Sequence, residues 1–385
     1  MSKDVLCLSH LRWGFVYQRP NHLMSRFARD GRVFFVEEPL FDAAAPYLET
    51  NEVEPNLTVA VPHLPPDAPP DVVTAMQRAL LDELVARERV SRPLLWFYTP
   101  MALAFAGHFV GDVTVYDCMD ELSGFHEAPL ELRARERELF SRADLVFTGG
   151  HSLYEAKRSA HPRAYPFPSS VEAAHFARAR AGSLPEPADQ AAIPCPRAGF
   201  FGVVDERMDL ELLGELADAL PSVHFVILGP VVKIDATSIP ARPNLHLLGM
   251  KKYEELPAYL AGWDVALMPF ALNEATRFIS PTKTLEYLAA GRPVVSTPIR
   301  DVVRPYGERG LVRVGEGPGF IAAVEAALAE RGGPEAQARR EAADQHVAQT
   351  SWDRTYEQMM ALIREVASPR ARASENLTPE MEAVT

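Results

Sequence analysis

FISPTKTLEYLAAGRPVVS, residues 278–296, predicts a helix followed by a buried strand. Ser280 is a favourable N-cap residue, and Pro281 suits the first helical position, where a missing N–H does no harm. Gly291 suits the position just after the last helical turn. The helix would therefore begin with free backbone N–H groups and the positive end of its dipole, and such an end binds phosphate readily.

Two charged side chains near the start of this helix indicate the same chemistry. Lys283 lies in the first turn, where the dipole normally disfavours a cation, and a bound diphosphate would reverse that penalty. Glu286 lies about one turn further along the same face. The alternative is that both are surface residues, with Lys283 solvated and Glu286 paired with it.

Short apolar runs alternate with helical stretches over most of the chain. Continuous runs indicate strands covered on both faces, and strand–helix repetition predicts doubly wound α/β domains. The expected strands of the first half are 5–9, 32–36, 57–61, 94–98, 113–116 and 145–148, with helices over 19–29 and 70–89. Those of the second half are 198–204, 223–228, 245–248, 265–268 and 293–297, with helices over 210–220, 253–261, 282–290 and 320–329.

The chain of 385 residues is long enough for two domains of roughly 150–200 residues each. A helical pattern also covers 336–366, and its later part carries an apolar stripe from Trp352 to Val366. The expected organisation is a Rossmann-like domain 1–176, a linker 177–196 without periodicity, a second Rossmann-like domain 197–350, a helix 351–367 and a disordered polar tail 368–385.

Composition excludes several classes of function. A formal net charge of −13 argues against nucleic-acid binding and does not favour adhesion to anionic lipid. Cys7, Cys118 and Cys195 are far apart and have no metal-site spacing, which predicts free thiols in a reducing cytoplasm and no bound metal. We expect neither a signal peptide nor a membrane-spanning helix, since no apolar run is long enough for either.

The segment 278–296 resembles the donor-binding signature of GT-B glycosyltransferases, specifically the large retaining family four. The shared pattern is Ser-Pro-x-Lys-x-x-Glu-Tyr-x-Ala-x-Gly-x-Pro-Val-Val. Segments 18–23, 116–122, 202–207 and 262–270 are similar to those of a bacterial polysaccharide or teichuronic-type subgroup, so the resemblance covers about residues 1–366. One position departs from the pattern: many members carry two glutamates eight positions apart, and here Phe278 replaces the first while Glu286 is the second.

The resemblance implies two Rossmann-like domains that face a cleft, with a C-terminal helix crossing back to the first domain. It implies a nucleotide-diphosphate sugar as donor and co-substrate, with no other cofactor, and a saccharide or lipid-linked saccharide as acceptor. It also implies retention at the anomeric carbon. Enzymes of this fold stabilise the departing phosphate with helix N-termini and basic side chains instead of a metal ion.

Donor-binding residues are expected in the second domain, and they are Arg207, Lys233, Ser280, Pro281, Lys283 and Glu286. Arg207 follows a strand in a loop that would face the binding crevice, where it would grip the diphosphate bidentately. The alternative is an ion pair with Asp205 or Asp209. Lys233, after Gly229-Pro230, is a weaker second candidate for the diphosphate. By resemblance, Glu286 would accept hydrogen bonds from the ribose hydroxyls.

Acceptor-side residues are expected in the first domain, where Asp117, Asp120 and Glu121 follow its fifth strand. Carboxylates at a strand end are costly if buried and useful if they face a cleft. Asp120 is the preferred group to orient or deprotonate the acceptor hydroxyl, with helix capping as the alternative. Three further candidates for the acceptor side are His10, Arg19 and His22, each of which has an equal structural alternative. The expected catalytic set is Asp120, Arg207 and Lys283.

The sequence therefore predicts a cytoplasmic, metal-independent glycosyltransferase of cell-surface or exopolysaccharide synthesis. A lipid-linked acceptor would call for peripheral contact with the inner membrane face. Two alternatives stay open: a nucleotide-sugar epimerase or hydrolase on the same scaffold, and a non-catalytic partner protein that resembles a transferase.

Overall fold

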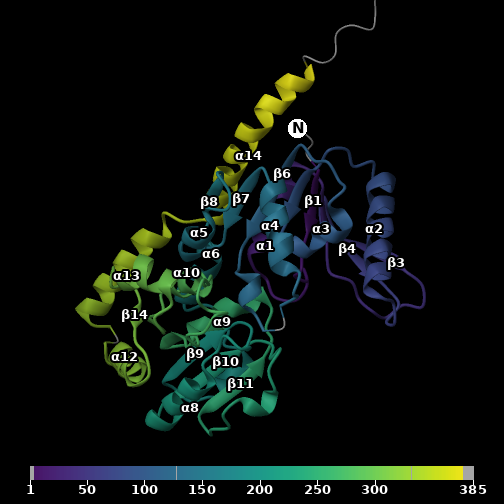
Figure 1. The fold of residues 1–385 in the computed structure, drawn as a ribbon. Coiled ribbons are helices and arrows are strands. Elements are labelled where there is room, and N and C mark those ends of the chain that lie inside the picture. Colours follow the sequence, from purple (N-terminus) through teal and green to yellow (C-terminus); the bar gives the residue numbers. More distant parts are fainter. Residues whose placement is uncertain (1–3, 127, 331, 376–385) are drawn as a thin grey trace, which may run out of the picture.

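The first of two sheets has eight strands in the order β3-β4-β2-β1-β5-β6-β7-β8 (Figure 1). The structure is a computed structural model that describes residues 4–126, 128–330 and 332–375. The strands are β1 (Val5–Leu8), β2 (Val33–Val36), β3 (Tyr47–Glu54), β4 (Leu57–His63), β5 (Leu94–Phe97), β6 (Val113–Cys118), β7 (Leu145–Thr148) and β8 (Ala164–Pro166). Neighbouring strands pair in parallel, except that β3 is antiparallel to β4.

Both faces of this sheet are buried, as the continuous apolar runs predict. Along β1, Val5 and Cys7 pack into one core cluster and Leu6 and Leu8 into another, because successive side chains of a strand point to opposite faces. One face is covered by α1 (Arg19–Asp30) and the C-terminal helix. The other is covered by α2 (Pro70–Arg87), α3 (Leu103–Ala106), α4 (Leu132–Arg142) and α5 (His151–Lys157).

The second sheet has six parallel strands in the order β11-β10-β9-β12-β13-β14. Its strands are β9 (Arg197–Phe201), β10 (His224–Leu228), β11 (Leu245–Gly249), β12 (Val265–Met268), β13 (Val294–Ser296) and β14 (Arg313–Val314). Its helices are α8 (Leu210–Ala219), α9 (Leu256–Ala261), α10 (Lys283–Ala289), α11 (Arg300–Val302), α12 (Pro318–Ala329) and α13 (Pro334–Val347). The strand order reverses between β9 and β12, and ligands bind beyond the carboxyl ends of strands at such a point.

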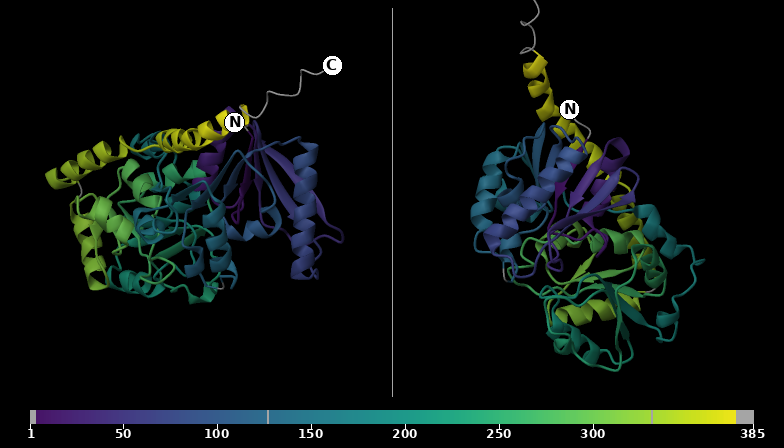
Figure 2. Two further views of the ribbon diagram at one scale, coloured as in Figure 1. Left: turned by 45° about the horizontal axis from the view of Figure 1, so that its top comes forward. Right: turned by 90° about the vertical axis from the view of Figure 1, so that its right-hand side faces the viewer.

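The last helix, α14 (Trp352–Glu375), returns to the first domain, as the resemblance implies. Figure 2 shows the last two helices, coloured yellow, following one another along one side of the molecule. Trp352, Met359 and Ile363 pack into the core cluster that contains α1. The single helical stretch expected over 336–366 is in fact two helices. The helix α13 packs on the second domain and ends at Val347, before α14 begins.

The segment 177–196, expected to be a linker, packs against the second domain. It includes α7 (Ala188–Ala191), and the chain also forms α6 (Ala173–Ala177) soon after leaving the first sheet. The Gln190 side chain is buried, accepts a hydrogen bond from Trp263 Nε1 at 2.9 Å and donates one to the Tyr259 carbonyl at 3.1 Å. A segment without sequence periodicity is thus held by specific polar contacts.

Three strands were not predicted, each for a physical reason. The strand β3 is polar and mostly exposed at the sheet edge, so it has no apolar run, while β8 and β14 are only 3 and 2 residues long. The expected tail 368–385 is helical over 368–375, and its remainder lies outside the described residues.

Candidate active site

Two adjoining pockets lie where the carboxyl ends of the parallel strands of the two domains meet. The helix pocket, about 140 Å³, is lined by Val16, Tyr17, Gln18, Phe201, Gly202, Val203, Arg207, Leu228, Gly229, Pro230, Met250, Lys251, Tyr253, Leu256, Thr282, Lys283 and Glu286. The junction pocket, about 110 Å³, is lined by Gln18, Arg19, Met119, Asp120, Gly149, Ser169, Val203, Arg207, Phe270, Ile279, Ser280, Pro281, Thr282 and Lys283. Because both pockets share Arg207 and Lys283, they form one continuous site between the domains.

The helix α10 presents its N-terminus to both pockets, but it begins two residues later than expected. The residue before its first turn is Thr282, without a side-chain cap, so Ser280 is not the N-cap and Pro281 is not in the first turn. Both residues instead line the junction pocket. The C-terminal prediction is confirmed: Gly291 has a φ of +70°, and its N–H donates to the Leu288 carbonyl at 2.9 Å, which closes the helix.

At this helix start Glu286 is buried and Lys283 is half-buried. Burial lowers the pKa of Lys283, and the nearby positive charge of Arg207 acts in the same direction. Burial raises the pKa of Glu286 to about 7, although the Lys283 charge opposes the shift, and the carboxylate atom Oε2 has no partner among the described residues. Gly202 makes room for the lysine, since a Cβ there would lie 2.2 Å from Lys283 Cε. Such burial fits a ligand-binding role better than a solvated surface pair.

Arg207 reaches both pockets from the loop after β9, and it also makes the alternative contact with Asp205. Its Nε donates to Asp205 Oδ1 at 2.9 Å and its Nη2 to Asp205 Oδ2 at 2.7 Å. The guanidinium lies 5.6 Å from the centre of the Phe125 ring, which comes from the first domain. The fork with Asp205 therefore fixes the orientation of Arg207 within the site.

Asp120 is the first-domain carboxylate that lines the junction pocket. Burial raises the pKa of Asp120, while the charges of Arg207 and Arg19 oppose the shift. A carboxylate with a raised pKa that faces positive charge across a cleft is suited to bind and orient a hydroxyl group.

Asp117 and Arg19, two predicted acceptor-binding residues, form a buried ion pair instead. Arg19 Nε donates to Asp117 Oδ2 at 3.0 Å and Nη2 to Oδ1 at 2.8 Å, and Nη1 donates to the Phe167 carbonyl at 2.7 Å. Asp117 has no exposed surface, so it offers no oxygen to an acceptor. Arg19 also borders the junction pocket, and the pair thus shapes its floor.

The other predicted acceptor residues lie outside the two pockets. Glu121 pairs with Lys157 at 2.7 Å, and this contact lowers the pKa of Glu121 against the effect of its burial. His22 stacks on Trp352 with ring centres 4.6 Å apart, so it anchors the last helix. Burial lowers the pKa of His10 to about 4, and Nδ1 of this neutral ring has no partner among the described residues.

Two further residues of the expected donor side, Lys233 and Phe278, do not place their side chains in the helix pocket. Lys233 does not line the helix pocket; its Nζ lies 5.6 Å from the centre of the Phe125 ring. Phe278 packs against a core cluster of the first domain, while the adjacent Ile279 and Ser280 line the junction pocket. In this chain the residues that follow Phe278, and not the Phe278 side chain, line the junction pocket. The first glutamate of the family motif, which Phe278 replaces, thus has no counterpart among the lining side chains.

Sequence reasoning missed the uncharged lining residues. Tyr17 and Tyr253 come from different domains and stack with ring centres 4.4 Å apart in the helix pocket. Gly149 lines the junction pocket, and a Cβ there would lie 2.1 Å from the Met119 carbonyl oxygen. In the sequence, only the doubled glycine at residues 149–150 indicates such a close approach of loops.

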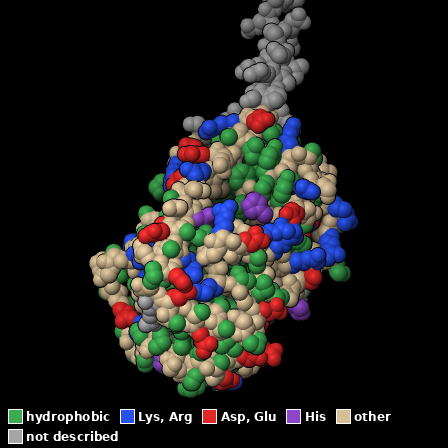
Figure 3. All heavy atoms as spheres, turned by 90° about the vertical axis from the view of Figure 1, so that its left-hand side faces the viewer, with side chains coloured by type: hydrophobic (Ala, Val, Ile, Leu, Met, Phe, Trp, Pro, Cys, Tyr) green, Lys and Arg blue, Asp and Glu red, His purple; other side chains and the backbone are tan. Residues whose placement is uncertain are grey.

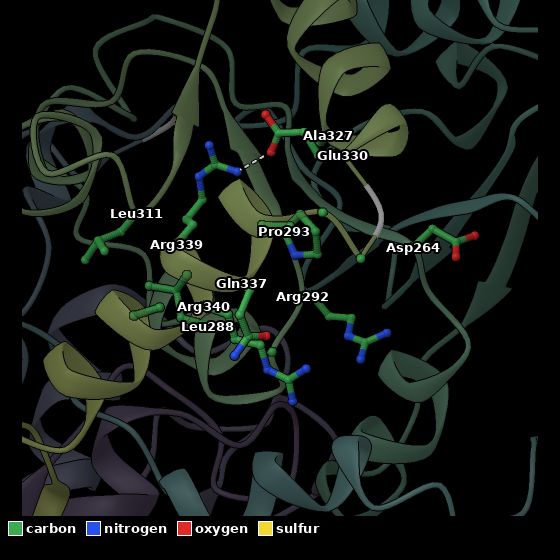
Figure 4. A pocket seen from close by; sticks show the side chains of 15 residues that line it. Asp264, Leu288, Arg292, Pro293, Leu311, Ala327, Glu330, Gln337, Arg339 and Arg340 are labelled. Carbon is green, nitrogen blue, oxygen red and sulfur yellow. Dashed lines mark hydrogen bonds and ion pairs between the residues drawn. The ribbon is translucent and has the colours of Figure 1, made fainter.

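A separate pocket of about 250 Å³ lies at the other end of α10 (Figure 4). Two of its lining arginines have structural partners: Arg339 pairs with Glu330, and Arg292 Nη1 donates to the Trp263 carbonyl at 2.7 Å. The surface on this side of the molecule carries both basic and acidic side chains (Figure 3). No group of three or more His, Cys, Asp or Glu side chains that could hold a metal ion occurs within the described ranges.

Comparison with known proteins agrees with this geometry. Residues 196–330 match the family model described as Glycosyl transferases group 1. The chain is 27% identical over 282 residues to TuaH of Bacillus subtilis (strain 168), which is named as a glycosyltransferase of teichuronic acid biosynthesis; the alignment covers 66% of this chain and 68% of that one.

Two solved structures share the fold. The sucrose-phosphate synthase of Thermosynechococcus elongatus matches with a TM-score of 0.68 at 14% identity, over 95% of this chain and 99% of its own. An E. coli trehalose-6-phosphate structure bound with UDP-2-fluoro glucose matches with a TM-score of 0.68 at 12% identity, over 94% and 99%. At these identities the likeness concerns the fold alone.

Proposed function

We propose that the chain is a GT-B glycosyltransferase that transfers a sugar from a nucleotide-diphosphate sugar to a hydroxyl of a saccharide acceptor. The match of residues 196–330 to the Glycosyl transferases group 1 model supports this proposal. The observation that carries the proposal is that half-buried Lys283 and buried Glu286 line one pocket with Arg207 at the start of α10. Cations and a helix N-terminus suit a diphosphate, and a buried carboxylate with an unpartnered oxygen suits sugar hydroxyls.

In the proposed reaction, the bond between the anomeric carbon and the diphosphate oxygen breaks as the acceptor oxygen bonds to the same carbon. Arg207 and Lys283 stabilise the negative charge that develops on the departing diphosphate. Asp120 accepts a hydrogen bond from the acceptor hydroxyl and orients it, and the hydroxyl proton passes to the departing phosphate. Attack from the face of the leaving group retains the anomeric configuration.

The wider setting is part of the same proposal. Similarity to a protein of teichuronic acid biosynthesis supports a role in polysaccharide synthesis, and we propose that the product is a cell-surface polysaccharide or exopolysaccharide. We assign the enzyme to the cytoplasm, with peripheral membrane contact if the acceptor is lipid-linked. Within the described part of the chain, no helix combines the length and apolar character that a membrane crossing requires.

The first test is thermal stability with UDP, GDP, dTDP and ADP, each with and without EDTA, on the wild type and on Glu286→Gln. A ligand that binds only the native state raises its stability by mass action. We expect one nucleotide to raise the melting temperature, with no effect of EDTA and a loss of the shift in the variant. A shift that needs metal would contradict the proposed mechanism, and no shift at all would favour the non-catalytic alternative.

The preferred nucleotide then identifies the donor to be assayed with saccharide acceptors. Transfer to an acceptor supports the proposal, whereas release of free sugar at the same rate without any acceptor would indicate a hydrolase.

A further inference from the structure

Tyr253 lines the helix pocket together with Glu286, and no hydrogen bond joins the two side chains. The tyrosine lies in the turn before α9, and both residues line the pocket. Tyr253 OH and Glu286 Oε2 are both buried, and neither has a hydrogen-bond partner among the described residues. Two buried polar atoms that lack partners and belong to the lining of one pocket point to a ligand that would satisfy both.

The two groups are close enough to interact electrically. After burial, the charge of Glu286 is the largest cause that raises the pKa of the Tyr253 phenol, so the hydroxyl keeps its proton at neutral pH. The Glu286 carboxylate only accepts hydrogen bonds when ionised, whereas a phenol both donates and accepts them. Together they match a pair of adjacent hydroxyl groups, which also donate and accept.

The ring of Tyr253 is held so that its hydroxyl cannot turn away from the pocket. It stacks on Tyr17 with ring centres 4.4 Å apart and on His175 with ring centres 4.3 Å apart. His175 Nε2 also lies 3.0 Å from the Tyr253 carbonyl oxygen. Because Tyr17 belongs to the first domain, the orientation of the phenol depends on both domains being in contact.

We propose that Tyr253 is a ribose-binding residue, whose hydroxyl acts with the Glu286 carboxylate on the 2′- and 3′-hydroxyls of the donor nucleotide. The inference rests on the proposed function, which supplies the nucleotide. A site whose buried polar groups need a ligand hydroxyl rejects an analogue that lacks it, because those groups are then left unpaired. Tyr253 therefore makes the site selective for ribonucleotides over deoxynucleotides.

The test is titration calorimetry with UDP, 2′-deoxy-UDP and 3′-deoxy-UDP, or the same series on the base that stabilises the wild type. Tyr253→Phe keeps the stacked ring and removes only the hydroxyl. The matched control is Tyr259→Phe, which removes a hydroxyl that donates to Asp189 Oδ1 at 2.7 Å outside the pocket. We expect Tyr253→Phe to bind UDP about three- to tenfold more weakly, the usual effect of one lost hydrogen bond.

The deoxy series identifies the partner of the phenol. Wild type and Tyr259→Phe should lose affinity for one deoxy form, while Tyr253→Phe should bind that form and UDP about equally. The inference is overturned if Tyr253→Phe keeps the wild-type affinity for UDP, or keeps the wild-type preference over both deoxy forms. If the wild type binds no nucleoside diphosphate at all, the proposed function fails, and this inference fails with it.

Discussion

Replacing Asp117 by Asn is expected to destabilise the protein strongly while leaving its shape intact. Asp117 has no exposed surface and Arg19 is 2% exposed, so the variant would leave a buried guanidinium without the carboxylate that accepts two of its hydrogen bonds. Removal of one partner from a buried ion pair typically costs about 3–5 kcal/mol. That is a large part of the roughly 5–15 kcal/mol by which folded proteins are stable.

The assay is urea unfolding followed by tryptophan fluorescence, which reports on the first domain through the fully buried Trp96. Asp218→Asn is the matched control, because Arg242 Nε and Nη2 donate to Asp218 at 2.6 and 2.8 Å in the same two-bond geometry at the surface. We expect the control to change stability little, since exposed pairs contribute little. Arg19→Lys keeps the charge but loses the two-bond contact with Asp117. Its urea concentration of half-unfolding should therefore lie between those of the wild type and Asp117→Asn.

The reasoning would be refuted if Asp117→Asn unfolded at the same urea concentration as Asp218→Asn. If the stable variant also showed a raised KM for the acceptor, Asp117 would be an acceptor-binding residue, as its position after the fifth predicted strand suggested.

Three further outcomes are expected. Burial raises the pKa of Glu286 to about 7, so its ionised, hydrogen-bond-accepting form gains population as pH rises. Calorimetry should therefore show that the wild type binds the nucleotide more tightly as the pH rises from about 6 to 8. In Glu286→Gln, the affinity should change with pH only as far as the titration of the nucleotide itself requires. Arg207→Ala should lower kcat/KM about 10²–10³-fold in a transfer assay, and an unchanged value would remove Arg207 from the mechanism. Trp352→Ala should destabilise the protein by about 3–5 kcal/mol in urea, because this side chain is 1% exposed in the first-domain core; a change below that of Asp218→Asn would contradict its anchoring role.

The placement of Lys283 and Glu286 at one helix start could be predicted because these residues lie close together in the sequence. The spacing of Lys283 and Glu286 puts both at one helix start, whatever the rest of the chain does. The start of α10 was misplaced by two residues, because Ser280 and Pro281 have the right types for a cap but line the junction pocket instead. The contacts between the domains thus outweigh the preference of these two residues for a helix start.

The acceptor side was less predictable, because its residues meet over long separations. Arg19 and Asp117 are 98 positions apart, and nothing in either segment indicates that one neutralises the other. Glu121 and Asp120 are adjacent, yet one pairs with Lys157 and the other faces the junction pocket. The side chains of two adjacent residues therefore point in different directions. Only the path of the backbone decides which carboxylate faces the cleft.

By itself, the sequence determined the class of fold, the order of the elements and the helix start at which Lys283 and Glu286 lie, since these depend on apolar runs and on neighbours within one turn. Only the tertiary structure decided which polar groups stay unpaired in the cleft. Tyr17, Tyr253 and Glu286 come from three separate segments, and their roles follow from burial and stacking between domains. Burial sets the energetic value of a polar group, and burial is a property of the folded chain as a whole.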